Sequence, residues 1–471
     1  MAPTVRSFSA DFEPLDLVER FPEVYPGLLE SGAAMTASSG SRFDILPMAS
    51  GESLRLDSQR QLSGAYAGNS GGFLSALENW WLALRLPQTP SLPHTPSLPQ
   101  APSLPQAPSL PFSGGWLLYL GYELASEIES RLRMPASSDP LIALALRAPA
   151  AWIRDRANGQ AWLVAEQGFE GMLDEFQRHV EALAAQRPPA ASRGVSFHVE
   201  EDDPARFIES VRRALEYTAA GDVYQTNLSR QWQGHSARAV NPVAIYKRLR
   251  DTNPSPFAAI LRCQDFALLS SSPERLVSVR GNRVSTRPIA GTRPRGATAA
   301  DDAVLIRSLL DNEKERAEHV MLIDLERNDL GRVCTGGTVQ VDEYMSVETY
   351  AHVHHIVSNV SGQLRDDVSP IGVIRALFPG GTITGCPKIR CMEIIAELEG
   401  CGRGAYTGSI GYLNRDGSCD LNILIRTITA QGSSCRFRAG AGIVADSVPA
   451  QELAETRAKA EGLLRAVEAR L

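Results

Sequence analysis

The sequence predicts an α+β protein, and three observations carry that prediction. Candidate strands cluster at residues 223–281 and again at 407–445. Helix patterns lie between these clusters without the strict alternation of strand and helix that a doubly wound sheet requires. The strands are short apolar runs, such as FAAILRC at 257–263, whereas the pattern at 203–220 is amphipathic and stops before Gly221, as a helix does.

The remaining elements follow from the same patterns. Helices are expected at about 171–185, 301–327, 387–399 and 448–471, and strands at about 407–414, 420–430 and 434–445. The segment VSTRPIAGTRPRG at 284–296 is expected to be a strand that leads into a stiff turn, because Pro288 and Pro294 fix φ and Gly291 relaxes it.

The chain is long enough for two domains, since it has 471 residues of which 43% are hydrophobic. We place the division in QRPPAASRG at 186–194, which gives an N-terminal region at 1–190 and a second domain at 195–471. Residues 87–111 repeat Ser-Leu-Pro with a six-residue period and predict an exposed polyproline-II insertion within the first region. An expanded surface loop is favoured there over a ligand for a proline-binding module.

Composition excludes several classes of protein. The net charge is -7 and the basic residues are scattered, which argues against non-specific nucleic-acid binding. No run approaches the roughly 20 apolar residues of a membrane span, and the first residues lack an apolar leader, so a cytoplasmic protein without a membrane partner is expected. The seven cysteines lack CxxC pairs near histidines, which favours buried thiols over disulfides or zinc.

Two helix patterns carry paired carboxylates. Glu315 and Glu318 are three residues apart and project from one face, as do Glu452 and Glu455, with Lys459 four residues further on. If the two helices faced each other, four carboxylates would form an oxygen-only site of the kind that suits Mg²⁺. A solvated face with a Glu455–Lys459 pair is the alternative, and a second pair of the same spacing weakens it.

Further positions outside these helices could carry chemistry. Gly440 and Gly442 would leave backbone N–H groups free to hold a carboxylate, or would mark a β-bulge. Arg426 is expected in an apolar strand, where it needs a carboxylate partner. In the alternating run AHVHHIVSNVSG at 351–362, one of the histidines could act as an acid or base, although a structural role is commoner for a single histidine. Glu274 ends a predicted strand.

Together these motifs resemble the chorismate-utilising enzymes, the family of anthranilate synthase, aminodeoxychorismate synthase, isochorismate synthase and salicylate synthase. The resemblance spans about 204–471 and rests on GDVYQTNLS, SPERL, RPIAGTRPRG, KERAEHVMLIDLERNDLGRV, HHIVSNVSG, FPGGTITGCPKIRCMEII, GSIGYL and AGAGIVADSVPAQELAET. FPEVYPGLLES and GGWLLYLGYEL extend it toward the N-terminus. It implies two stacked, largely antiparallel β-sheets with helices packed outside, and a chorismate-binding catalytic domain at 195–471.

The resemblance also implies how the carboxylates of chorismate are held. Glu318 and Glu455 would bind Mg²⁺, with Glu315 and Glu452 supporting through water, and the metal would hold the ring carboxylate. The groups implied at the two substrate carboxylates are Lys459 and the backbone of Gly440, Ala441 and Gly442 at the ring, and Arg426 and Tyr406 at the enolpyruvyl group.

The reacting end of the site is implied in the same way. Glu274 would be the general acid that helps the C4 hydroxyl to leave. His355 matches the family's active-site histidine, and Thr382 a threonine near the ring. Family members that add water at C2 carry a lysine base where this chain has Gln225, which points to ammonia as the nucleophile.

The resemblance leaves two candidate products. YQTNLS, TITG and the segment at 119–124 resemble aminodeoxychorismate synthase component I, an enzyme of the para-aminobenzoate and folate pathway. PIAGTRPRG, with Ala290, Gly291 and Thr292 expected near C2, resembles anthranilate synthase component I, because the well-known aminodeoxychorismate synthases have a covalently attacking lysine where Ala290 stands. The first is favoured, with ammonia supplied by a separate glutaminase subunit. A non-catalytic partner-binding member is the disfavoured alternative.

A second ligand is also implied. Glu30 and Ser31 in LLES, and Pro256 and Phe257 in NPSPF, resemble the segments that form a tryptophan pocket in this family. A structural or vestigial pocket is the alternative.

Overall fold

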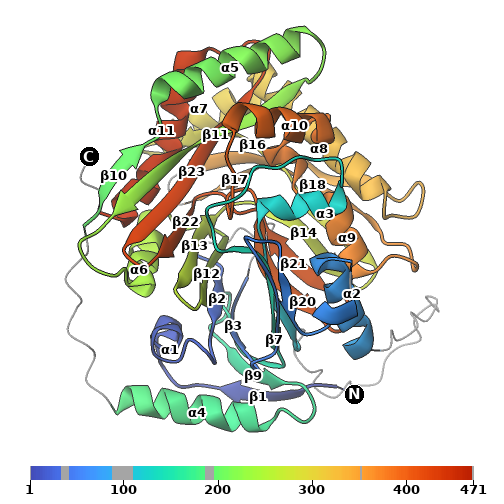
Figure 1. Ribbon diagram of the computed structural model, residues 1–471, viewed down its shortest axis with the longest axis vertical. Helices are drawn as coiled ribbons and strands as arrows, with labels where there is room; N and C mark the ends of the chain where they lie inside the picture. Colours follow the sequence, from blue (N-terminus) through green and yellow to red (C-terminus); the bar gives the residue numbers. More distant parts are fainter. Residues whose placement is uncertain are drawn as a thin grey trace.

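The computed structural model describes residues 2–32, 42–69, 71–86, 110–185, 196–350 and 353–468. Two large β-sheets occupy the middle of the molecule and helices lie outside them (Figure 1). Every pair of neighbouring strands in the described ranges is antiparallel, and both strands and helices are abundant. The predicted α+β class and the two antiparallel sheets with outer helices are confirmed.

The first sheet has twelve strands. Their order is β1 (Thr4–Phe8), β9 (Ala161–Ala165), β8 (Ala150–Asp155), β3 (Phe43–Met48), β2 (Gly27–Glu30), β12 (Phe257–Cys263), β13 (Phe266–Ser272), β22 (Thr427–Gln431), β23 (Ser434–Ile443), β11 (Gln225–His235) and β10 (His198–Glu201), with β19 (Gly385–Cys386) also paired to β11.

The second sheet has eleven strands. Their order is β16 (Ile289–Pro294), β18 (Val353–Gln363), β15 (Arg283–Arg287), β14 (Arg275–Arg280), β21 (Cys419–Asn422), β20 (Ser409–Asn414), β6 (Gly115–Leu120), β7 (Leu141–Ala148), β4 (Ser53–Asp57) and β5 (Leu62–Gly64), with β17 (Gln340–Thr349) also paired to β18.

Helices cover the outer faces of both sheets (Figure 1). They are α1 (Pro14–Arg20), α2 (Phe73–Leu84), α3 (Ala125–Ile128), α4 (Gly171–Ala184), α5 (Pro204–Ala219), α6 (Pro242–Thr252), α7 (Ala299–Leu310), α8 (Glu313–Gly331), α9 (Pro370–Leu377), α10 (Lys388–Glu399) and α11 (Pro449–Ala466), with 3-10 turns η1 (Ala67–Asn69), η2 (Tyr122–Leu124) and η3 (Gly381–Ile383). Local chemistry sets their ends: Asp203 caps the start of α5, and Gly400, with φ of 63°, ends α10.

Three predicted elements were wrong in detail. The helix expected at 301–327 is two helices, because Asn312 accepts a hydrogen bond from the Glu315 N–H and starts α8 afresh. The stiff turn expected within 284–296 is the paired strand β16, which tolerates its prolines at the edge of the sheet. The strand expected at 420–430 is two strands, β21 and β22, which belong to different sheets.

Both sheets combine strands from either side of the expected division at 186–194. Residues 186–195, and 87–109 of the proline repeat, lie outside the described ranges, so the domain division and the polyproline-II insertion stay predictions. Between the sheets, one apolar cluster joins the two parts of the chain, since Leu117 and Leu144 from one sheet pack with Leu261 and Leu268 from the other.

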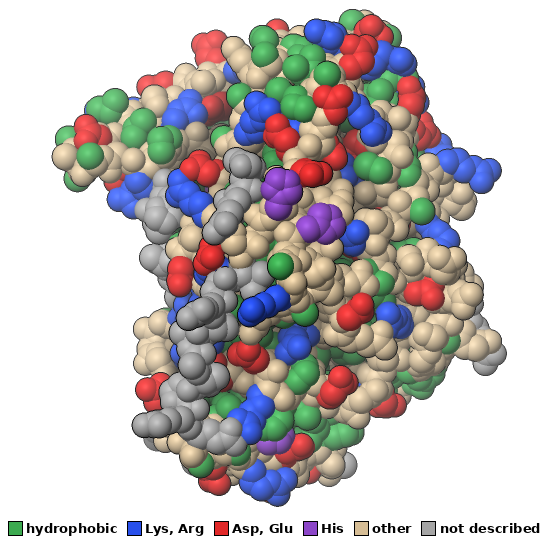
Figure 2. All heavy atoms as spheres, turned by 60° about the vertical axis from the view of Figure 1, so that its left-hand side comes forward, with side chains coloured by type: hydrophobic (Ala, Val, Ile, Leu, Met, Phe, Trp, Pro, Cys, Tyr) green, Lys and Arg blue, Asp and Glu red, His purple; other side chains and the backbone are tan. Residues whose placement is uncertain are grey.

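The surface shows both charge signs. On the face in Figure 2, Lys and Arg side chains are interspersed with Asp and Glu side chains. Among the helices that the described ranges contain, none combines the length and the apolar character needed to cross a bilayer.

Replacing Leu268 by alanine should destabilise the fold. Leu268 is fully buried between the sheets, and such truncations typically cost ~2–5 kcal/mol because they leave a cavity. Leu82→Ala on α2, where the side chain is 43% exposed, is the matched control and should change the free energy of unfolding by less than ~0.5 kcal/mol. Urea unfolding followed by tryptophan fluorescence measures both, and equal losses would contradict the role of the inter-sheet cluster.

Candidate active site

Two chain segments pass from one sheet to the other side by side. After β13 the chain enters the second sheet as β14, and after β21 it returns to the first sheet as β22. The two crossings are joined by hydrogen bonds from the Ile423 N–H to the Glu274 carbonyl (3.0 Å) and from the Ser271 N–H to the Arg426 carbonyl (3.1 Å). Glu274 and Arg426 are therefore held together between the sheets.

Glu274 is a buried carboxylic acid poised near neutrality. Its side chain is 6% exposed, and the Thr382 hydroxyl donates to its Oε1 at 2.5 Å. Burial raises the pKa of Glu274 to about 7, while Thr382 and the charges of Lys459 and Arg426 oppose that rise. A carboxyl with this pKa carries a proton for a substantial fraction of the time near pH 7, as a general acid requires.

Arg426 lies at the second crossing and not within a strand as expected, with φ of 52°. Burial lowers its pKa, and the charge of Glu274 opposes that effect. Within the described ranges its guanidinium makes no hydrogen bond or close ion pair, so Glu274 acts on it through its charge alone and not as the paired carboxylate that was expected. A buried cation of this kind is suited to bind an anionic ligand.

His355 lies on β18 opposite Thr292 of β16. Its Nδ1 is 2.9 Å from the Thr292 hydroxyl and 3.3 Å from the Gly291 carbonyl oxygen. Because a carbonyl only accepts, Nδ1 carries the proton, which leaves the buried Nε2 as a base without a partner in the described ranges. Burial and the charge of Arg426 lower the pKa of His355 to about 4, so the ring is neutral near pH 7.

The segment with Ala290 forms a bulged strand edge. Ala290 is buried opposite Ile356, and the register shifts between Ala290 and Thr292. Gly291 absorbs the bulge with φ of 62°, and a Cβ there would lie 2.8 Å from Glu315 Oε2. The glycine thus lets strand β16 approach the first turn of α8.

The four predicted carboxylates come from α8 and α11. Burial raises the pKa of Glu318, and the negative charge of Glu455 adds to the rise. Burial also raises the pKa of Glu452. Glu315 Oε1 pairs with Arg293 at 2.7 Å, and its Oε2 is buried without a hydrogen-bond partner in the described ranges. The two helices therefore bring their carboxylates within electrostatic reach of one another.

A divalent cation such as Mg²⁺ binds hard oxygen donors and would offset the repulsion between neighbouring carboxylates. The four glutamates of α8 and α11 therefore have the chemistry that this ion prefers. The side chains are not gathered as a ready cluster: no group of three or more His, Cys, Asp or Glu side chains in the described ranges is placed to hold a metal ion. Glu455 instead pairs with Lys459 at 2.7 Å.

Gly440 and Gly442 present amides at an open strand edge. Their partners on β11, Ser229 and Asn227, donate their own N–H groups to Glu399 (2.8 Å) and to the Thr384 carbonyl (3.0 Å), so neither pair exchanges hydrogen bonds across the strands. The N–H and C=O groups of both glycines therefore point away from β11. Lys459 Nζ donates to the Gly440 carbonyl at 3.0 Å on that edge.

Tyr406 and Gln225 adjoin these glycines. A Cβ at Gly440 would lie 2.7 Å from the Tyr406 hydroxyl, and one at Gly442 would lie 2.3 Å from Gln225 Nε2. Gln225 Nε2 donates to Glu318 Oε1 at 3.1 Å, which links this edge to the carboxylates on α8. The glycines thus make room for two predicted site residues, and the predicted residues meet in one region.

The sequence interpretation missed a buried ionic cluster behind Tyr406. Glu399 pairs with Arg403 at 2.6 Å and with Arg438 at 3.0 Å. The Arg403 guanidinium also donates to the Asn227 carbonyl at 2.6 Å and lies 5.5 Å from the Tyr406 ring centre. Arg403 stands between two glycines, and that pattern was its only local signal.

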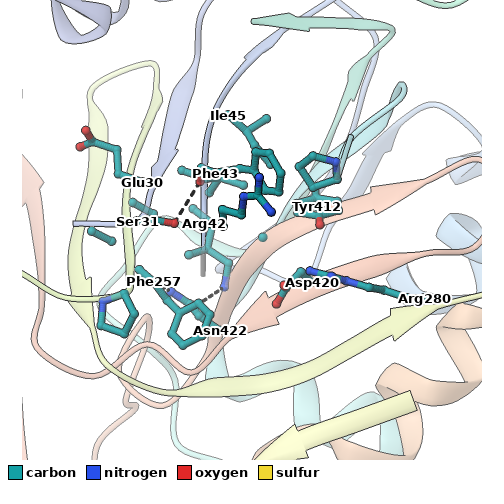
Figure 3. A pocket seen from close by; sticks show the side chains of 17 residues that line it. Glu30, Ser31, Arg42, Phe43, Ile45, Phe257, Arg280, Tyr412, Asp420 and Asn422 are labelled. Atoms are coloured by element: carbon teal, nitrogen blue, oxygen red, sulfur yellow. Dashed lines mark hydrogen bonds between the residues drawn. The ribbon is translucent and has the colours of Figure 1, made fainter. Parts of the chain in front are cut away.

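A separate cavity of about 70 Å³ lies between the sheets (Figure 3). All four residues of the expected tryptophan pocket line it: Glu30, Ser31, Pro256 and Phe257. The Glu30 carboxylate points away from the other labelled side chains in Figure 3, because it accepts hydrogen bonds from Tyr246 at 2.8 Å and Arg250 at 3.3 Å. The prediction therefore located a real cavity, whose ligand it does not establish.

Comparison with known proteins shows the family. A family model described as chorismate binding enzyme matches residues 56–465. The aminodeoxychorismate synthase component 1 of Bacillus subtilis is 43% identical over 370 residues, covering 76% of this chain and 77% of that protein. The anthranilate synthase component 1 of Thermus thermophilus is 50% identical over 262 residues, 56% of each chain.

Solved structures agree as well. Anthranilate synthase component I from Streptococcus pneumoniae superposes with a TM-score of 0.76 at 29% identity, covering 91% of this chain and 93% of that one. The menaquinone-specific isochorismate synthase of Escherichia coli shares the fold, with a TM-score of 0.70 at 19% identity over 99% of this chain and 95% of that one. The fold, the family model and the relatives agree, and the chain belongs to the family of chorismate-binding enzymes.

Proposed function

We propose that this protein aminates chorismate, converting chorismate and ammonia to 4-amino-4-deoxychorismate and water. The observation that carries the proposal is the placement of Glu274, an acid with a pKa of about 7, beside Arg426, a buried cation whose guanidinium makes no hydrogen bond or close ion pair in the described ranges. Together they suit a carboxylated substrate that must lose a hydroxyl group. Gln225 supports ammonia over water as nucleophile, since it offers no basic amine.

The residues divide the work as follows. Arg426 and Tyr406 bind the enolpyruvyl carboxylate, and Lys459 with the outward amides of Gly440 and Gly442 binds the ring carboxylate. Glu274 donates its proton to the C4 hydroxyl, which leaves as water, and Thr382 fixes the orientation of the acid. Ammonia supplies the new nitrogen and loses a proton as the C–N bond forms.

Mg²⁺ is proposed at the carboxylates of α8 and α11. Glu318 and Glu455 would hold it, with Glu315 and Glu452 in support, and it would supply positive charge for the ring carboxylate. Glu452 and Glu318 have raised pKa values because of burial, so a nearby cation would stabilise their charged forms.

Anthranilate is the second candidate product, and one observation favours it. Ala290 has no amine, so the covalent adduct at C2 that a lysine would make is unavailable. Ammonia that entered at C2 instead would lead to anthranilate and pyruvate. The relatives carry both names at similar identity.

A glutaminase subunit is the proposed source of ammonia. The Bacillus subtilis relative is named component 1, which supports a second component. Tryptophan is the proposed occupant of the cavity in Figure 3, whose lining combines the aromatic rings of Phe43, Phe257 and Tyr412 with the polar groups of Arg42 and Asn422.

The product assay tests the function. The purified chain, chorismate, Mg²⁺ and an ammonium salt should give 4-amino-4-deoxychorismate by mass spectrometry, and EDTA should stop turnover until Mg²⁺ is restored. Anthranilate as sole product, detected by its fluorescence, would establish the second candidate.

Ala290→Lys, run in parallel, should raise the yield of the aminodeoxy product, because it restores an amine beside C2.

The pH profile tests Glu274. Its protonated form is needed, and its pKa is raised to about 7, so kcat/KM should fall as the pH rises above 7. Thr382→Val removes a hydrogen bond that stabilises the carboxylate, so the pKa should rise and the alkaline limb should move up by ~0.5–1 pH unit. Thr338→Val, remote from the acid, is the control. An unmoved limb in Thr382→Val would show that Glu274 is not the titrating acid.

Calorimetry tests the cavity. L-Tryptophan titrated into the protein should release heat with one site per chain, and L-phenylalanine should bind more weakly because it lacks the indole N–H. The absence of a tryptophan signal at millimolar concentration would assign the cavity a structural or vestigial role.

A further inference from the structure

The turn that carries Tyr406 is held by two carboxylates from the N-terminal part of the chain. The turn comprises residues 402–407, between α10 and β20. Glu123 of η2 accepts hydrogen bonds at its Oε1 from the N–H groups of Arg403 (2.7 Å) and Gly404 (3.2 Å). Asp139, just before β7, accepts one at its Oδ2 from the Ala405 N–H (3.0 Å). Three successive amides thus converge on two carboxylates.

The turn geometry depends on this arrangement. Gly404 has φ of 59°, and a Cβ at that position would lie 2.1 Å from Asp139 Oδ2. Successive amides that point into one concavity form a site that favours negative charge. The backbone here is therefore shaped around the two side chains, and only glycine permits the close approach of Asp139.

Both carboxylates are deeply buried, so their hydrogen bonds contribute strongly to the stability of the turn. Glu123 is 2% exposed and Asp139 is 5% exposed. Asp139 Oδ1 also accepts hydrogen bonds from Thr429 and Arg436, each at 3.3 Å. A buried carboxylate that lost its hydrogen-bond donors would be strongly destabilised. The carboxylates therefore hold the amides of the turn in place, and the amides hold the carboxylates.

The 402–407 turn fixes the position of Tyr406. The Tyr406 N–H donates to the Arg403 carbonyl at 3.1 Å, and the Arg403 guanidinium packs on the Tyr406 ring. The hydroxyl of Tyr406 is thereby set against Gly440, on the strand edge that faces the proposed substrate. A shift of the backbone at residues 403–405 would move this hydroxyl.

We propose that Glu123 and Asp139 are positioning residues for substrate binding, which act by holding the 402–407 turn so that Tyr406 meets the carboxylate of chorismate. The inference rests on the proposed function of Tyr406. Neither carboxylate touches the substrate, and the N-terminal part of the chain contributes to substrate affinity through them.

The variants separate positioning from folding. Glu123→Ala removes the acceptor of two amides and should raise KM for chorismate about tenfold, equivalent to ~1.4 kcal/mol, with kcat little changed. Glu123→Gln keeps an oxygen at the same place and should restore KM to within about twofold of the wild type. Leu173→Ala, which truncates a buried side chain of α4 in a different apolar cluster, is the control and should leave KM unchanged in the folded protein.

A double-mutant cycle with Tyr406→Phe closes the test. If Glu123 acts through Tyr406, adding Glu123→Ala to Tyr406→Phe should raise KM much less than it does in the wild type. Additive effects would overturn the inference. If Tyr406→Phe leaves KM unchanged, the proposed function of Tyr406 fails, and with it the route by which Glu123 acts.

Hydrogen exchange provides a readout independent of turnover. The amides of residues 403–405 should exchange faster in Glu123→Ala than in the wild type and in Glu123→Gln. Unchanged exchange in Glu123→Ala would overturn the proposal even if the reaction proved to be a different one.

Discussion

The paired crossing of two strands between the sheets is the constraint on which the site depends. In the first sheet Ser270 pairs with Thr427, and in the second Arg275 pairs with Asn422. Residues 273–274 and 423–426, which connect these strands, belong to neither sheet. The segments stay together because they bond to each other. A side chain placed there faces no neighbour across a strand, so Glu274 can be buried as an acid that accepts a hydrogen bond from Thr382.

Most elements around this crossing could be predicted from sequence, but the crossing itself could not. Short apolar runs predicted β12 and β13, and the paired glutamates predicted one face of α8. The run at 420–430 predicts one strand because apolar periodicity is a local signal and does not show which sheet a residue joins. Arg426 was singled out because an unpaired buried cation is costly wherever it lies. Its place beside Glu274 is a property of the crossing, which local sequence does not show.

The buried cluster of Glu399, Arg403 and Arg438 was harder still to predict. Glu399 and Arg403 are four residues apart, but Arg438 is 39 residues from Glu399, and nothing local shows that it joins them. Removing one partner of such a pair costs ~3–5 kcal/mol because the other is left buried and charged. That penalty explains how Arg403 can serve as a rigid support for Tyr406: the guanidinium is held in place by the charge it must neutralise. Carboxylates from the N-terminal part then complete the support from the opposite side of the same turn.

The same electrostatics bear on how the nitrogen must arrive. Burial and Arg426 lower the pKa of His355 to about 4, so this histidine is too weak a base to deprotonate ammonium. Gln225 is not basic, and Ala290 offers no amine. Glu274, the group that titrates near neutrality, is needed as an acid. If the proposed function is right, none of these four residues can remove a proton from ammonium to make the nucleophile. Nitrogen therefore has to reach the substrate as neutral ammonia. A partner that releases ammonia directly to the site satisfies that requirement better than ammonium in bulk water, where the neutral form is the minor species at pH 7.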